Sequence, residues 1–217
     1  MRLYLASTSP ARLATLRAAG IEPIVVPSEV DEEAVVAAAE ASGNLLSPAE
    51  MVLLLGRAKA EAVSGRLIDG EPIDGFVLGA DSAFELDGVS YGKPHLASVA
   101  RERWLMQRGR TGHLHTGQWI VDHRAGTVGG GAGAVSTAAV TFSATMTDAE
   151  IDAYIATGEP LEVAGAFTID SLGAAFITAV EGDPHTVVGL SVSTLRELVL
   201  GFGTPWPSLW TTLASDS

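Results

Sequence analysis

Residues 5–12, LASTSPAR, place three hydroxyl side chains between an apolar run and a proline. A strand that enters a helix through small hydroxyl residues points free backbone N–H groups and the positive end of the helix dipole at one place, which suits a phosphate group. Arg12, one turn into the helix, can add a bidentate contact to the same anion. On this segment alone an ordinary cap by Ser9 is the simpler interpretation. A cap, however, needs one hydroxyl, and the segment supplies three.

Asp81 interrupts the strongly apolar segment 76–86, FVLGADSAFEL. A lone carboxylate inside an apolar strand costs several kcal/mol unless it is paired, hydrogen-bonded or bound to a metal, so a purely structural Asp81 is the less favoured interpretation. Lys93 lies just beyond the following turn, where it can return to the same end of the sheet. A carboxylate that activates water or holds a cation, beside an ammonium that balances charge, suits a hydrolytic phosphate site.

Two further features bear on the same chemistry. The acidic residues in VDEE, residues 30–33, can supply oxygen ligands to Mg²⁺ or Mn²⁺, although a solvated helix start is the better interpretation of that segment alone. Only two of the thirteen basic residues are lysines, Lys59 and Lys93. Because the planar fork of arginine cannot always replace a compact ammonium, both lysines are candidates for a function, with two ordinary surface lysines as the alternative.

Two other motifs predict no site. His113 and His115 share one face of a predicted strand, but a zinc site needs a third ligand that no nearby residue provides. The glycine-rich segment 126–134, GTVGGGAGA, is not a P-loop because no GK[ST] follows it, and it is not a dinucleotide fingerprint because it leads into a strand. We expect it to be a mobile turn.

These residues must be positioned by an α/β framework, which hydrophobic periodicity and helix-start signals predict. Ser47 with Glu50 and Thr147 with Glu150 form capping boxes for two of the helices. The predicted strands are 2–6, 23–27, 76–86, 113–123 and 134–145, and the predicted helices are 10–19, 48–63, 98–109, 148–157 and 191–200. An acidic loop runs into a further helix after residue 30. We expect the tail after the last helix to pack along the surface.

Whole-chain properties exclude several classes of protein. The 217 residues suffice for one large domain or two small lobes, and the absence of cysteine excludes disulfides, thiolate metal sites and cysteine nucleophiles. A formal charge of −13 argues against a partner nucleic acid. No apolar run approaches the roughly 20 residues of a membrane span, and the N-terminal segment is too soon polar for a signal peptide. We therefore expect no membrane partner and a cytoplasmic location.

Taken in order, the motifs SxSPxR, VDE, AKA, GADS and GKP resemble the Maf family of nucleoside triphosphate pyrophosphatases. The later segments GRTGHLHTG, GEP and VVGL match as well, so the resemblance extends from residue 3 to about 200. It implies a single domain over residues 1–201 with a tail over 202–217. The implied fold is an elongated mixed twisted sheet flanked by helices, with two lobes and a central cleft, similar to inosine triphosphate pyrophosphatases; a homodimer is left open.

The implied reaction is attack of water on the α-phosphorus of a nucleoside triphosphate, with Mg²⁺ or Mn²⁺ as cofactor. The products are the nucleoside monophosphate and pyrophosphate. Carried over by motif, the resemblance makes Asp81 the proton acceptor and, with Glu32, a metal ligand. It assigns contacts to the phosphates to five residues: Ser7, Ser9, Arg12, Lys59 and Lys93.

Three positions depart from the subgroup that prefers dTTP and UTP. Members of that subgroup resemble one another in having an Arg, a Thr and a Gln at the three positions where this chain has Ala11, Ser82 and Asp170. The subgroup selective for methylated GTP carries an aromatic residue, a Gln and a Glu at these positions, and only the acidic Asp170 is similar to its counterpart there. We therefore predict a different or broader nucleotide preference. A nucleotidyltransferase and a non-catalytic regulator of septum formation are the alternative functions.

Overall fold

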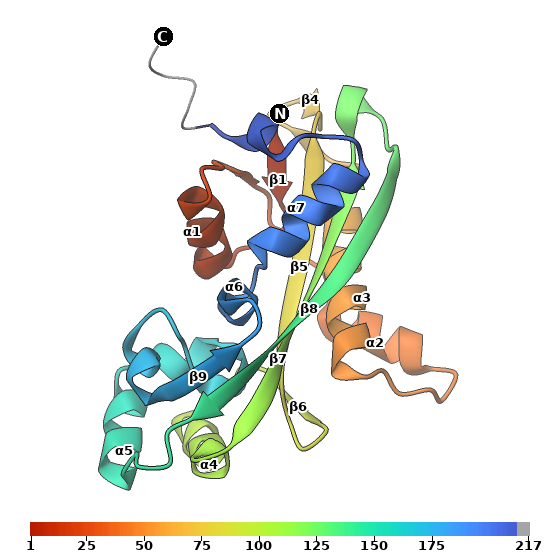
Figure 1. The fold of residues 1–217 in the computed structure, drawn as a ribbon. Coiled ribbons are helices and arrows are strands. Elements are labelled where there is room, and N and C mark those ends of the chain that lie inside the picture. Colours follow the sequence, from red (N-terminus) through yellow and green to blue (C-terminus); the bar gives the residue numbers. More distant parts are fainter. Residues whose placement is uncertain (212–217) are drawn as a thin grey trace.

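A mixed seven-stranded sheet forms the centre of the computed structural model, which describes residues 1–211 (Figure 1). Its strand order is β2-β1-β5-β7-β8-β9, and β6 also pairs with β5. Strand β1 runs parallel to β2 and β5, and all other neighbours are antiparallel. The strands are β1 Leu3–Leu5, β2 Ile24–Val25, β5 Phe76–Leu86, β6 Val89–Tyr91, β7 Thr111–Asp122, β8 Gly130–Phe142 and β9 Ile177–Glu181; β3 Leu67–Ile68 and β4 Glu71–Pro72 form a separate ribbon.

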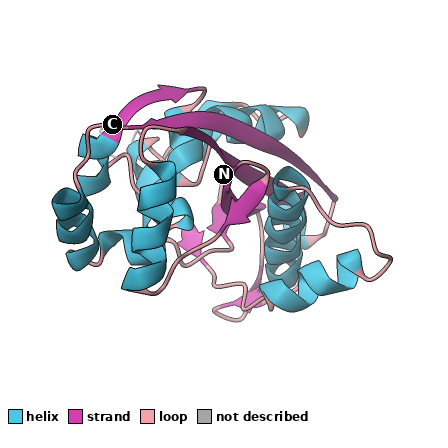
Figure 2. Ribbon diagram, turned by 90° about the horizontal axis from the view of Figure 1, so that it is seen from below, coloured by secondary structure: helices cyan, strands magenta, loops and turns pink. Residues whose placement is uncertain are grey.

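Helices cover both faces of this sheet (Figure 2). They are α1 Pro10–Ala18, α2 Glu32–Glu40, α3 Pro48–Ser64, α4 Ala97–Gln107, α5 Asp148–Ala156, α6 Pro184–Val188 and α7 Val192–Gly201. Both predicted capping boxes are present, at the starts of α3 and α5. Helix α4 begins one residue earlier than expected, at Ala97, and has no side-chain cap. The predicted α/β architecture, a mixed sheet flanked by helices, is confirmed.

The core divides into an upper and a lower part along the long strands (Figure 1). In the upper part, one face of β5 packs against α1 and α7 through residues such as Leu78, and the other face packs against α3 through residues such as Val77. In the lower part, Phe84 belongs to an aromatic cluster with residues of α4 and α5. Residues 81 and 82 of β5 lie between the two parts.

One edge of β5 is unpaired where the two parts meet. Strand β1 pairs with residues 76–78, and β6 pairs with residues 84–86 on β5. Strand β7 covers the other edge continuously from Phe76 to Glu85. Because β1 ends before residue 81 and β6 begins after it, Asp81 lies at a gap in the sheet edge that side chains from several elements can reach.

Helix α3 approaches the sheet unusually closely because three glycines line the contact. A Cβ atom on Gly79 would lie 2.6 Å from the backbone nitrogen of Ala60 and closer still to the carbonyl oxygen of Gly56. A Cβ on Gly117 would lie 2.5 Å from the backbone nitrogen of Leu53. Real Cβ atoms do not reach such distances, so only glycine permits this packing. The close approach fixes the height of α3 above β5.

Only part of the glycine-rich segment 126–134, residues 126–129, lies in the connection between β7 and β8, and the rest differs from the prediction of a turn. Residues 130–134 belong to β8 and pair with β7 in register. The physical reason is the indole of Trp119 on β7, which lies across these residues. A Cβ on Gly131 would lie 2.6 Å from its Nε1 atom, and one on Gly133 would overlap the same ring. Gly131 and Gly133 are therefore strand residues that make room for a tryptophan.

The chain after α7 also differs from the expectation of a surface segment. A 3₁₀ turn, Trp206–Leu209, follows, and Leu209 is fully buried in the core cluster shared by α1 and α7. The backbone N–H of Thr211 donates to the carbonyl of Gly20, which ties this segment to the end of α1. The remainder of the predicted tail, residues 212–217, lies outside the described residues. Within residues 1–211, no helix has the length and apolar character needed to cross a membrane.

Candidate functional site

Lys59 lies between two carboxylates at the gap in the β5 edge. Its Nζ atom is 2.6 Å from an oxygen of Asp81 and 2.8 Å from an oxygen of Glu32. The side chains of Lys59 and Asp81 are only 10% and 15% exposed. Their ion pair therefore offsets the desolvation penalty of a carboxylate in an apolar strand. Three elements thus meet here: β5 carries Asp81, α3 carries Lys59 and the first turn of α2 carries Glu32.

Arg12 extends the same group of charges from the start of α1. Its guanidinium donates to the carbonyl of Gly189 at 2.8 Å, to the hydroxyl of Ser82 at 3.2 Å and to the hydroxyl of Ser7 at 3.3 Å. Burial lowers the pKa of Arg12, and the negative charges of Asp81 and Glu32 act in the opposite direction. Because these carboxylates lie close enough to act on it, we call Arg12, Glu32, Lys59 and Asp81 the Asp81 cluster.

The hydroxyl segment both caps α1 and supports Arg12. The Ser9 side chain accepts from the backbone N–H of Arg12 at 3.4 Å, which is the predicted N-cap. The Ser7 hydroxyl accepts from the backbone N–H of Ser9 at 3.1 Å and from the Arg12 guanidinium. Thr8 is exposed between them, and Ala11 lies half-buried on α1. The contacts of these residues with phosphate stay a prediction.

Ser82 belongs to a chain of hydroxyls that the sequence did not reveal. Its Oγ atom lies 2.9 Å from that of Thr116 on β7, and Thr116 donates to the carbonyl of Thr186 on α6 at 2.7 Å. Thr186 in turn donates to Ser136 on β8. The Ser82 hydroxyl is therefore engaged by Thr116 and by the guanidinium of Arg12. Its identity bears on how that guanidinium is oriented.

Among the described residues, neither Lys93 nor Asp170 forms a hydrogen bond or an ion pair with the Asp81 cluster. Lys93 follows β6, which runs back toward residue 81, but its half-exposed side chain is 3.9 Å from Glu162. Asp170 is exposed in the segment before the 3₁₀ turn Leu172–Phe176. Both residues stand on the lower part of the molecule. The partner that the sequence suggested for Asp81 was Lys93, whereas the structure pairs Asp81 with Lys59.

The model of the family described as Maf-like protein matches residues 2–202. The chain belongs to the Maf-like protein family. A protein from Leifsonia xyli named nucleoside triphosphate pyrophosphatase is 69% identical over 210 residues, covering 97% of each chain. One of the same name from Salinispora tropica is 49% identical, covering 97% of this chain and 88% of its own.

Among solved structures, the chain matches that of the Staphylococcus aureus Ham1 protein. It covers 98% of this Maf-like chain and 95% of its own length, with a TM-score of 0.41 and 12% sequence identity. The family assignment therefore rests on the sequence matches, which extend over nearly the whole chain.

The residues of this Maf-like chain that would hold a divalent cation are Glu32 and Asp81. Oxygens of both carboxylates lie within hydrogen-bond distance of the single Lys59 ammonium, so they converge on one point occupied by positive charge. Hard oxygen donors of this type fit Mg²⁺ or Mn²⁺, which commonly take one or two carboxylates and complete their shell with phosphate and water. Among residues 1–211, no group of three or more His, Cys, Asp or Glu side chains is arranged to hold a metal by itself.

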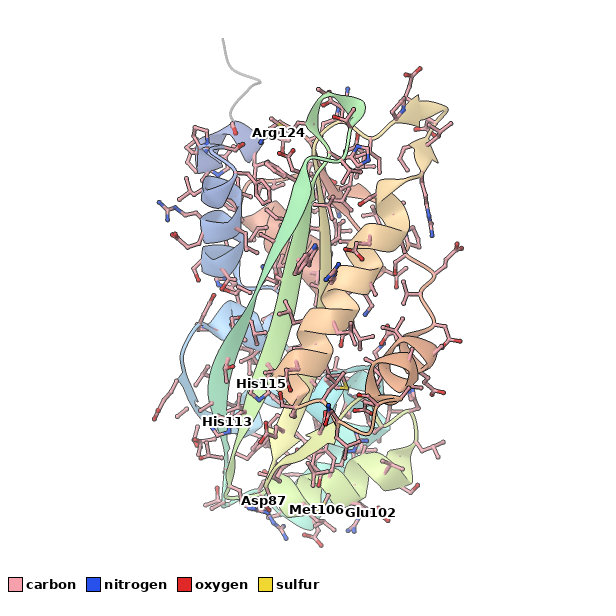
Figure 3. The ribbon with its side chains drawn as sticks, turned by 90° about the vertical axis from the view of Figure 1, so that its right-hand side faces the viewer. Asp87, Glu102, Met106, His113, His115 and Arg124 are labelled. Atoms are coloured by element: carbon pink, nitrogen blue, oxygen red, sulfur yellow. The ribbon has the colours of Figure 1, made fainter. Side chains whose placement is uncertain are left out.

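Within residues 1–211, the two histidines on β7 belong to no group of three metal-ligating side chains. The rings of His113 and His115 stack with centroids 6.4 Å apart on one face of the sheet (Figure 3). His115 lies 3.0 Å from a Glu85 oxygen and 2.9 Å from the Thr137 hydroxyl. These contacts satisfy both ring nitrogens of His115 within the sheet.

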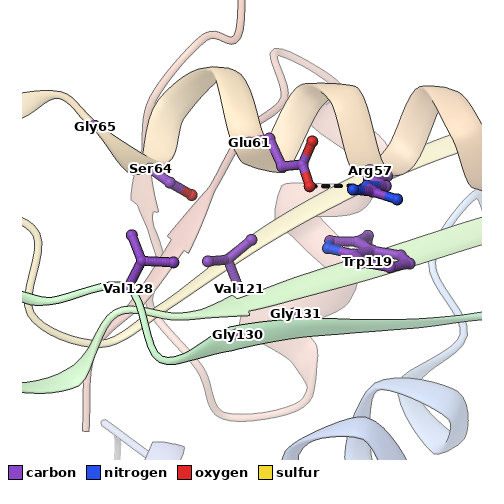
Figure 4. Close-up of a pocket in the computed structure, with 9 residues that line it drawn as sticks. All are labelled: Arg57, Glu61, Ser64, Gly65, Trp119, Val121, Val128, Gly130 and Gly131. Carbon is purple, nitrogen blue, oxygen red and sulfur yellow. Dashed lines mark hydrogen bonds and ion pairs between the residues drawn. The ribbon is translucent and has the colours of Figure 1, made fainter.

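A hollow of about 650 Å³ lies apart from the Asp81 cluster, between α3 and the β7–β8 hairpin (Figure 4). Arg57 stands over the Trp119 ring, 5.0 Å from its centroid, and pairs with Glu61 at 2.8 Å. These two residues flank Lys59 in sequence, yet their side chains meet at Trp119 and not at Asp81. This hollow holds none of the predicted site residues.

Proposed function

We propose that this Maf-like protein hydrolyses nucleoside triphosphates to monophosphates and pyrophosphate through attack of water on the α-phosphorus. The observation that carries the proposal is the Asp81 cluster: a partly buried carboxylate beside a lysine, a glutamate and a buried arginine, at a gap in the sheet edge. Relatives up to 69% identical carry the name nucleoside triphosphate pyrophosphatase, which supports the same reaction. Cations that hold phosphate next to a proton-accepting carboxylate are the groups that this hydrolysis needs.

Each residue has a distinct part in the proposed reaction. Arg12 and the backbone N–H groups at the start of α1 hold phosphate oxygens, because both point positive charge at the same place. Asp81 accepts the proton of the attacking water, and Lys59 neutralises charge that develops on the phosphate. Glu32 and Asp81 would bind Mg²⁺ or Mn²⁺, which when bound polarises a phosphoryl oxygen. Lys93 approaches the leaving pyrophosphate from the lower part of the molecule.

The nucleotide preference is proposed to be broader than, or different from, that of the dTTP- and UTP-preferring relatives. Ala11 cannot offer the charge that an arginine would bring to the start of α1. Ser82 acts through Arg12, since its hydroxyl is shared between that guanidinium and Thr116. Asp170 presents a carboxylate where those relatives have an amide. A carboxylate accepts hydrogen bonds but cannot donate them, whereas an amide does both.

Release of pyrophosphate from a triphosphate in the presence of Mg²⁺, with no acceptor molecule added, tests the proposal. Hydrolysis predicts equal amounts of monophosphate and pyrophosphate, and the Asp81→Asn variant should lose about a hundredfold or more in rate while remaining folded. Activity that requires an added sugar phosphate would indicate a nucleotidyltransferase instead. An Asp81→Asn variant with the turnover of the unaltered protein would exclude Asp81 as the proton acceptor.

A location in the cytoplasm, the absence of nucleic-acid and membrane partners, and assembly into a homodimer remain proposals. The formal charge of −13 supports the exclusion of nucleic acid, since two strongly negative surfaces repel each other. Sedimentation of the full chain over a range of concentrations measures the oligomeric state.

A further inference from the structure

A single carboxylate, that of Glu159, ties the end of α5 to segment 168–173 in the lower part of the molecule. Glu159 opens the 3₁₀ turn Glu159–Glu162 directly after α5 and accepts hydrogen bonds from five donors. The Oε1 atom accepts from the Tyr154 hydroxyl at 2.9 Å, the Thr168 hydroxyl at 2.5 Å and the Gly173 N–H at 3.0 Å. The Oε2 atom accepts from the Ser171 hydroxyl at 2.8 Å and the Leu172 N–H at 3.2 Å. Four of the five donors belong to the segment 168–173.

The charge of Glu159 is maintained by these contacts. Desolvation raises its pKa, but the hydrogen bonds from Thr168, Ser171, Gly173 and Tyr154 outweigh that effect and lower the pKa to about 2. The carboxylate is therefore ionised under all ordinary conditions. Hydrogen bonds to an ionised acceptor are roughly twice as strong as neutral ones, so Glu159 holds segment 168–173 firmly.

The same turn also touches the loop that carries Lys93. The backbone N–H of His95 donates to the carbonyl of Leu161 at 3.0 Å, and Lys93 and His95 both approach Glu162. Glu159 thus anchors a turn with two neighbours that carry predicted site residues: the loop after β6 with Lys93 on one side and segment 168–173 with Asp170 on the other. Both neighbours lie in the lower part of the molecule, across the β5 gap from α1 and α3.

We propose that Glu159 is the positioning residue for the nucleoside end of the substrate, which rests on the proposed function above. Segment 168–173 contains one acid, Asp170, and no cation, so it repels a triphosphate and suits the uncharged base and sugar. The phosphate groups bind instead at the Asp81 cluster, where Arg12 and Lys59 lie. Glu159 touches no substrate atom; it fixes the backbone from which the nucleoside is read.

Substitution of Glu159 by Gln keeps the shape but places an NH₂ group where an oxygen was. Whichever oxygen is replaced, at least two of the five donors lose their acceptor and face another donor. Because segment 168–173 is loosened and the Asp81 cluster is untouched, we expect KM to rise about tenfold or more and the saturating kcat to stay within about threefold. The ratio of kcat/KM between the best and the worst of ATP, GTP, CTP, UTP and dTTP should shrink.

Two further variants separate positioning from general stability. Ser171→Ala removes one donor from an exposed position and leaves the Glu159 carboxylate in place, so the same change in KM and selectivity is expected in smaller measure. Asp152→Asn removes an exposed α5 carboxylate that pairs with Arg101 and is expected to behave as the unaltered protein. Amide hydrogen exchange should quicken at Leu172 and Gly173 in Glu159→Gln and not in Asp152→Asn.

The inference is overturned if Glu159→Gln keeps its KM and base selectivity, or if kcat falls as much as KM rises. Should Glu159→Gln fail to fold, unchanged selectivity and KM in Ser171→Ala overturn it equally. If the unaltered protein releases no pyrophosphate from any triphosphate, the proposed function fails, but the positioning role is still measured with α,β-methylene triphosphates. Weaker and less selective binding of these analogues by Glu159→Gln supports the role, and unchanged binding refutes it.

Discussion

The Gly79→Ala substitution tests how the close packing of α3 sets the geometry of the Asp81 cluster. The new Cβ would lie 2.6 Å from the backbone nitrogen of Ala60, whereas ordinary contacts begin at 3.4 Å. Relief of this overlap requires α3 to move away from β5 by at least about 0.8 Å. Lys59 precedes Ala60 on the same helix, so its distance to Asp81 would grow from 2.6 Å to about 3.4 Å, beyond a normal hydrogen bond.

This displacement has separate consequences for stability and for catalysis. Overpacking of a tight contact costs about 1–3 kcal/mol of unfolding free energy. A misplacement of about 1 Å in a catalytic constellation lowers the rate by about a hundredfold. We therefore expect Gly79→Ala to fold with a lowered melting temperature and to release pyrophosphate about a hundred times more slowly.

Gly56 on α3 and Gly65, the C-cap residue of that helix, provide a graded comparison. Gly65, at the end of the helix, has open space where a Cβ would be and a negative φ, so Gly65→Ala should match the unaltered protein. At Gly56 a Cβ would lie 3.0 Å from the carbonyl oxygen of Gly117, a milder overlap. Alanine also favours the helix by about 1 kcal/mol, so Gly56→Ala should lose activity with little loss of stability.

Thermal unfolding and pyrophosphate release, measured on all three variants, decide the matter. The expected order of rates is Gly65→Ala, then Gly56→Ala, then Gly79→Ala. A folded Gly79→Ala variant with the rate of the unaltered protein would refute the argument that the α3 contact positions Lys59.

Three further predictions follow from the contacts of single side chains. The Arg12→Lys variant lacks the planar guanidinium that donates to three acceptors at once. The KM for triphosphates should therefore rise about thirtyfold, which corresponds to about 2 kcal/mol. Steady-state kinetics with an unchanged KM would contradict this. Lys59→Gln leaves Asp81 partly buried without its cation, so both urea stability and pyrophosphate release should fall, and retention of both would show that the pair is dispensable. The pKa of Glu159 is lowered to about 2, so the ionised carboxylate contributes to the free energy of unfolding, on the order of 2 kcal/mol. This contribution is present above pH 4.5 and is lost as the pH falls toward 2. Urea unfolding across that window should show a smaller loss in Glu159→Gln, and equal losses would contradict it.

The sequence predicted the elements of the fold better than the contacts between them. The capping boxes at Ser47 and Thr147 were visible because they depend on residues three positions apart. The sequence predicted that Asp81 must have a partner, since an apolar strand does not tolerate a lone carboxylate. Its partner was not, because the choice of Lys59 depends on how closely α3 approaches β5 through glycines far apart in sequence.

Other parts of the site could not be predicted because main-chain groups make them. The carbonyl of Gly189 accepts from Arg12, and the N–H groups of Leu172 and Gly173 donate to Glu159. A residue type does not reveal whether its backbone is free to bind a distant side chain. The glycines around Gly131 were interpreted as a turn because their requirement, room for Trp119, comes from the neighbouring strand.

Hydrolysis in water enriched in ¹⁸O tests the central claim most directly, since it identifies the phosphorus that water attacks. The protein is incubated with a nucleoside triphosphate and Mg²⁺, and both products are analysed by mass spectrometry, with Asp81→Asn as the inactive comparison. Attack on the α-phosphorus at the Asp81 cluster predicts one ¹⁸O atom in the nucleoside monophosphate and none in pyrophosphate. Label in pyrophosphate, or release of single phosphates, would contradict it.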